Sequence, residues 1–91
     1  MKYEENIKRL IQIVQHWKQV IDSKEEEYFK YASEYNNLLG NDSIEAEERR
    51  RQILEMGPRD TDYDELDLAY RNLYKQIPKR DVWFIRKLYN I

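Results

Sequence analysis

Hydrophobic residues recur at alternating spacings of four and three through the first forty positions of the chain. The series runs Tyr3, Ile7, Leu10, Val14, Trp17, Ile21, Lys24, Tyr28, Tyr31, Tyr35 and Leu38, and only Lys24 is not hydrophobic. An average spacing of 3.5 residues places such a series along one side of an α-helix, whereas a β-strand would need alternate residues. The pattern therefore predicts one long amphipathic helix over about residues 3–39.

Such a helix determines the shape of a chain of only 91 residues. At about 1.5 Å per residue it would extend for roughly 55 Å, which is longer than a compact domain of this size is wide. Ser23 and Glu26 read as a capping box that would allow a kink. No Gly or Pro accompanies the box and the stripe continues in phase beyond it, so we expect a single helix and an elongated fold.

Two or three shorter helices are expected after Gly40, a residue suited to the left-handed conformation at a helix end. The second, over about 43–56, would have Asp42 as its N-cap and would end at Gly57. A third over about 62–77 has hydrophobic residues three and four apart and stops before Pro78, and a C-terminal helix follows over about 79–90. We therefore expect one all-α domain over residues 1–91, an elongated helical bundle built on a long coiled-coil-like helix.

The composition argues against several functional classes. The chain has no cysteine, so it has neither a disulfide framework nor a thiolate metal site. It has no run of about 18 apolar residues that could span a bilayer, and its first residues do not form a signal peptide, so a cytoplasmic location is expected. The single histidine, His16, and two isolated glycines offer neither a nucleophile with its base nor a Gly-rich phosphate loop.

Acidic residues raise the possibility of a metal site. Asp60, Asp62 and Asp64 alternate as at the start of a calcium loop, but Glu65 and Arg71 occupy the places that need glycine and glutamate. Acidic residues in the first turn of a helix are favoured by its dipole, which explains this cluster without a ligand. We therefore expect no metal and no cofactor.

A small all-helical, metal-dependent hydrolase or mutase stays as a second alternative. Acidic residues three apart, as in Glu45 with Glu48 and Asp64 with Asp67, would share a helix face and could hold magnesium. The layout of a long helix followed by shorter ones is also similar to that of the small all-helical chorismate mutases. The stripe of the long helix here is aromatic and aliphatic, so no residue of that family is carried over. The sequence favours a protein that is not an enzyme, with no catalytic residues.

The net charge of -2 conceals a marked asymmetry along the second half of the chain. Residues 41–70 contain ten acidic residues against four arginines, whereas residues 71–91 contain six basic residues against Asp81 alone. In the C-terminal helix, neighbouring residues point about 100° apart, so the run Val82 to Ile85 cannot face one core. Residues 82, 85 and 89 would form a stripe for the core, and Trp83 would share an exposed face with Lys87.

These patterns predict a self-associating protein-protein interaction module that acts as a small assembly, adaptor or inhibitory subunit. A homodimer and a larger protein partner are expected, and so small and charged a chain also suits a bacterial or phage regulator. The predicted protein-binding residues are Trp83, Phe84, Arg80, Arg86 and Lys87. The predicted oligomer seam is Ile7, Leu10, Val14, Trp17, Ile21, Tyr28, Tyr31 and Tyr35. The alternative is a nucleic-acid-associated protein that uses the basic, aromatic C-terminal segment, although the whole chain is acidic.

Overall fold

The protein is all-α and elongated. A computed structural model describes residues 2–91, with side chains from residue 5 onward, and contains no strand within that range. The helices are α1 (Lys2–Leu38), α2 (Ile44–Met56), α3 (Asp60–Lys75) and α4 (Lys79–Tyr89). The molecule measures 60 × 19 × 18 Å and its radius of gyration is 18.4 Å, against about 12 Å for a compact domain of this length. The expected elongated, all-α fold is confirmed.

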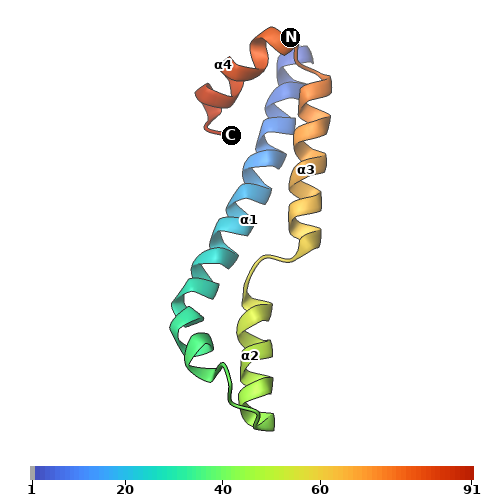
Figure 1. The fold of residues 1–91 in the computed structure, drawn as a ribbon. Helices are drawn as coiled ribbons and strands as arrows, with labels where there is room; N and C mark the ends of the chain where they lie inside the picture. Colours follow the sequence, from blue (N-terminus) through green and yellow to red (C-terminus); the bar gives the residue numbers. More distant parts are fainter. Residues whose placement is uncertain (1) are drawn as a thin grey trace.

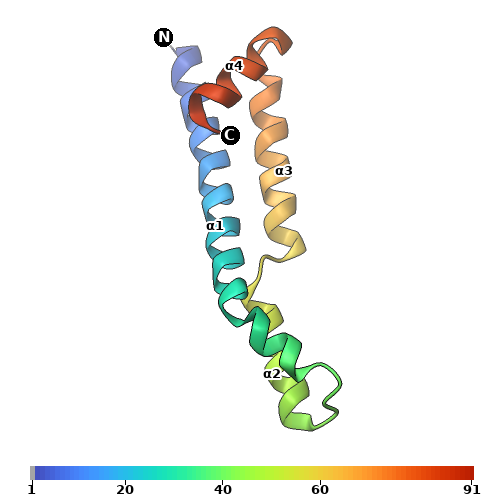
Figure 2. The same cartoon turned by 60° about the vertical axis from the view of Figure 1, so that its left-hand side comes forward.

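The long helix α1 is the spine on which the other helices lie. Helices α2 and α3 follow one another along it, both antiparallel to it, and α4 crosses the end where α1 begins (Figures 1 and 2). We call the part built from α1, α3 and α4 the three-helix end. The part built from residues 28–38 of α1 and from α2 is the two-helix end. The two ends differ in the number of helices that can bury apolar surface.

Helix α1 continues through Ser23 without a break. The polar residue in its stripe, Lys24, lies where α1 meets the first turn of α3, and its Nζ lies 2.6 Å from Oδ2 of Asp62. Asp62 is only 8% exposed and also accepts a hydrogen bond from the backbone N–H of Arg59 at 2.9 Å. Lys24, the residue that interrupts the hydrophobic stripe, therefore forms an ion pair that holds the start of α3 against α1.

The helix ends show which local residues stop each element. Gly40 has a φ of +83°, the left-handed conformation expected for it. The expected N-cap Asp42 is wrong: Ser43 has that role, because its Oγ accepts a hydrogen bond from the backbone N–H of Ala46 at 3.2 Å. Helix α2 therefore begins one residue later than expected. Arg50 closes the connection by donating to the carbonyl oxygens of Leu38 and Asn41.

The hydrophobic core is concentrated in the three-helix end. Its buried residues come from α1, from α3 and its C-terminal flank, and from the last residue of the chain: Ile11, Val14, Ala69, Leu73, Ile77 and Ile91. In the two-helix end only Ala46 and Ile53 of α2 are buried, and the three tyrosines of the stripe are half-buried. Two helices cannot enclose a core as three can, so this end is more weakly packed.

The predicted oligomer seam packs largely within the chain itself. Val14 and Ile21 are buried, Ile7, Leu10 and Trp17 are half-buried, and α3 and then α2 contact α1 along its length. Two short helices, α3 and α2, lie one after the other along the stripe (Figure 1), so much of it is covered within a single copy of the chain. Self-association itself stays a prediction.

Protonation of Asp62 is expected to weaken the fold. The backbone N–H of Arg59, and next the ammonium of Lys24, hold the pKa of Asp62 below its ordinary value. A lowered native pKa means that this stabilisation is present above the unfolded pKa, about 3.9, and is lost as the pH falls through the native value. Asp62→Asn should lower the melting temperature at pH 7, and its difference from the unaltered protein should shrink below about pH 3.

The matched control for this experiment is Asp64→Asn, since Asp64 is exposed two residues further along the same helix. Thermal unfolding followed by circular dichroism at several pH values would measure both variants. Equal melting temperatures for Asp62→Asn and Asp64→Asn at pH 7 would show that the ion pair with Lys24 does not stabilise the protein.

Candidate protein-binding surface

Helix α4 divides into an inner and an outer side. It begins after Pro78 and ends before Asn90, the cap residue, whose φ of 55° is left-handed. On the inner side Val82, Ile85 and Tyr89 pack against the core of the three-helix end. This is the stripe that the 100° rotation per residue assigned to the core.

Hydrogen bonds from two other helices hold the end of α4 in place. Gln15 of α1 donates to the carbonyl of Tyr89 at 3.4 Å, and Nζ of Lys18 donates to the carbonyl of Asn90 at 3.0 Å. The hydroxyl of Tyr70 in α3 donates to the carbonyl of Ile91 at 2.8 Å, and burial raises the pKa of Tyr70. The cation of Lys18 also lies where a helix dipole is negative. Helix α4 is therefore docked at a defined position on α1 and α3.

The outer side of α4 exposes large apolar side chains. Trp83 is 68% exposed, Phe84 60% and Leu88 62%. Nζ of Lys87 lies 4.8 Å from the centre of the Trp83 ring, within the range of a cation-π interaction. We call the following residues the α4 outer surface: Arg80, Trp83, Phe84, Arg86, Lys87 and Leu88, all of them exposed.

All five residues predicted from the sequence as protein-binding lie on this surface. Leu88 is an addition that the sequence reasoning missed, although its spacing of four from Phe84 would have placed the two on one face. Lys18 is a second addition, from α1. With Trp83, Arg86 and Lys87 it lines a hollow of about 400 Å³ beside the end of α4.

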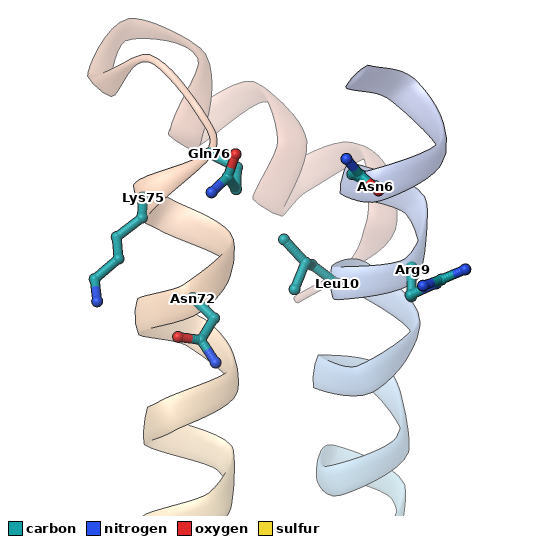
Figure 3. Close-up of a pocket in the computed structure, with 6 residues that line it drawn as sticks. All are labelled: Asn6, Arg9, Leu10, Asn72, Lys75 and Gln76. Atoms are coloured by element: carbon teal, nitrogen blue, oxygen red, sulfur yellow. The ribbon is translucent and has the colours of Figure 1, made fainter. Parts of the chain in front are cut away.

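A second hollow lies between α1 and α3 near the start of α1. It has a volume of about 310 Å³ and is lined by Asn6, Arg9, Leu10, Asn72, Lys75 and Gln76. Figure 3 shows Leu10 pointing towards α3, whereas the charged ends of Arg9 and Lys75 point away from each other. The lining residues include no carboxylate and no histidine, so they supply no general acid-base pair.

The acidic residues considered as metal ligands are engaged in other ways or scattered. Within the part of the chain that the structure describes, no three histidine or acidic side chains gather as a metal site would require. Asp62 contacts Lys24, and Oδ2 of Asp67 lies 2.9 Å from Nη2 of Arg71 four residues further along α3. That pair is the ordinary arrangement on a solvated helix face. The absence of enzymatic activity stays a prediction.

No family model, curated protein or solved structure matches this chain. Among residues 2–91, none of the helices combines the length and apolarity that crossing a bilayer demands. The fold and the surface therefore define a class only: an elongated all-α protein with an exposed, basic and aromatic helix docked across one end. The cytoplasmic location stays a prediction.

Proposed function

We propose that this chain is a protein-protein interaction module whose α4 outer surface binds an acidic surface of a partner protein. It would act as an assembly, adaptor or inhibitory subunit, without chemistry of its own. The observation that carries the proposal is the exposure of Trp83, Phe84 and Leu88 on one short helix whose inner side is already packed. The fold does not need these side chains for its core.

The chemistry of the α4 outer surface suits a protein contact. Exposed apolar side chains that gather in one patch mark interaction sites more often than isolated ones do. Trp and Arg are also the types that most often carry binding energy at the centre of an interface. The surrounding cations, Arg80, Arg86 and Lys87, would favour an acidic partner and would speed its association.

Trp83→Ala is expected to weaken partner binding by about 2 kcal/mol or more, which is roughly a 30-fold loss of affinity. The melting temperature should stay close to that of the unaltered protein, because Trp83 is mostly exposed. Quantitative capture from an extract of the native host on immobilised protein, followed by mass spectrometry, would measure the effect.

The control variant is Leu68→Ala, which removes an exposed apolar side chain from α3 instead of α4. A partner retained by Leu68→Ala and lost by Trp83→Ala supports the proposal. Equal capture by both variants would contradict it. Unfolding of Trp83→Ala would show that this residue belongs to the core.

The hollow beside α4 favours one alternative, a nucleic-acid-associated protein. Lys18, Arg86 and Lys87 line this hollow with Trp83, and cations beside an aromatic ring suit a phosphate next to a stacked base. The replacements Arg86→Gln and Lys87→Gln together test it in an electrophoretic shift with mixed DNA and RNA. A shift by the unaltered protein that this double variant abolishes would put the alternative in place of the proposal.

A further inference from the structure

The side of α1 that carries α4 continues uncovered towards the middle of the molecule. Gln15 and Lys18 hold the end of α4 on this side. Residues seven apart in a helix lie within about 20° of one another, so Asp22 and Phe29 follow Gln15 on the same side. Helix α4 crosses only the beginning of α1 (Figures 1 and 2), and Asp22 and Phe29, which come later in α1, are exposed.

This uncovered part of α1 combines acidic and apolar side chains. Phe29 is 68% exposed, and Asp22 and Glu26 are exposed on the same side of the helix. We call Asp22, Glu26 and Phe29 the acidic α1 surface. Its charge is opposite to that of the α4 outer surface, and each of the two surfaces exposes at least one aromatic side chain.

One copy of the chain cannot bring the two surfaces together. Helix α4 is held by Gln15, Lys18 and Tyr70 with its inner side on the core, so it cannot move its outer surface along its own α1 to the acidic α1 surface. A second copy placed antiparallel would carry its own α4 to the uncovered part of α1. A two-fold axis that passes beside α1, at the level of Val20, would place position 18 of one copy opposite position 22 of the other, and likewise 11 opposite 29. The α4 of each copy would then lie on the part of the other copy's α1 that the other copy's own α4 leaves uncovered.

We propose that the occupant of the acidic α1 surface is the α4 outer surface of a second copy, in an antiparallel dimer with two-fold symmetry. The inference rests on the proposed function, since it takes the α4 outer surface as the binding surface and names the partner. The two-fold symmetry produces two equivalent contacts, and in each of them the α4 outer surface of one copy lies on the acidic α1 surface of the other. An interface that uses the same two surfaces on each copy closes as a dimer and does not grow into a filament.

The area of the molecule is consistent with such a dimer. The accessible surface of the chain is 7298 Å², whereas a compact folded monomer of its mass exposes about 5,700 Å². The excess, about 1,600 Å², is about twice the roughly 800 Å² per partner that a stable interface of standard size buries. An elongated molecule lying alongside a second copy has enough surface to form this interface.

The test exchanges the charges of the two surfaces and measures mass by light scattering at about 50 μM. The first variant carries Arg86→Glu and Lys87→Glu, and the second carries Asp22→Lys and Glu26→Lys. Each variant alone would face like charges in both contacts, so its dimer dissociation constant should rise by at least about 100-fold. In an equal mixture, both contacts of a mixed dimer are complementary again, so dimers should return.

The unaltered protein should have about twice the monomer mass of 11.3 kDa. The matched control, Glu47→Lys with Glu48→Lys, makes the same change of charge on exposed residues of α2 and should leave the dimer intact. Circular dichroism would establish that every variant is folded. Phe29→Ala should also weaken the dimer, by about tenfold or more.

The outcomes separate this inference from the proposed function. A monomeric unaltered protein, or two charge variants that stay monomeric when mixed, would overturn the antiparallel dimer. A dimer that survives in each variant alone would overturn it as well. Capture of a different partner that Trp83→Ala abolishes would then still support the proposed function. A dimer that forms as described supports both.

Discussion

Replacing Leu73 with Ala is expected to lower the free energy of unfolding by about 2–5 kcal/mol, the range for removing a large aliphatic side chain from a closed core. Leu73 is completely buried and belongs to the core cluster that also contains Val14 of α1 and Ile91. Its loss would leave a cavity among parts of three helices that cannot all move to fill it. Urea unfolding followed by circular dichroism would measure the change.

Leu68→Ala is the control for this replacement, because Leu68 lies on the same helix but is exposed. It should change the unfolding free energy by less than about 0.5 kcal/mol. Trp17→Ala should be intermediate, because Trp17 is half-buried. If Leu73→Ala and Leu68→Ala destabilised the protein equally, the packing of α3 on α1 would differ from that described here.

Periodicity was sufficient to predict α1 but not what covers it. The stripe with a spacing of 3.5 residues requires a partner surface, yet the partner can be another copy or a later part of the same chain. The turn at Gly57 sends α3 onwards along α1 after α2, and that geometry is not contained in the hydrophobic pattern. Ile11 was missed because α4 covers α1 beside the stripe, so residues outside the seam are buried too.

Helix rotation was sufficient to predict most of the candidate site. The 100° between neighbouring residues separates Val82 and Ile85 from Trp83, and the structure places the first two on the core and the third in solvent. The contribution of Lys18 could not be predicted in this way. It lies far from α4 in the sequence, and only the docking of α4 across the beginning of α1 brings it to Asn90.

The two-helix end is expected to open independently when its main buried side chain is removed. Ile53 is completely buried, whereas the α1 residues facing α2, such as Tyr31, are only half-buried, so Ile53 is the largest fully buried side chain in the contact between α2 and α1. Ile53→Ala should therefore lower the opening free energy of amides in α2 by about 2–5 kcal/mol, up to the global unfolding value, with a much smaller change in α3. Native-state hydrogen exchange measures both regions in one experiment.

Leu54→Ala, which removes the exposed neighbouring side chain, should leave exchange nearly unchanged. An equal loss of protection in α2 and α3 would instead show that the two ends unfold as one cooperative unit.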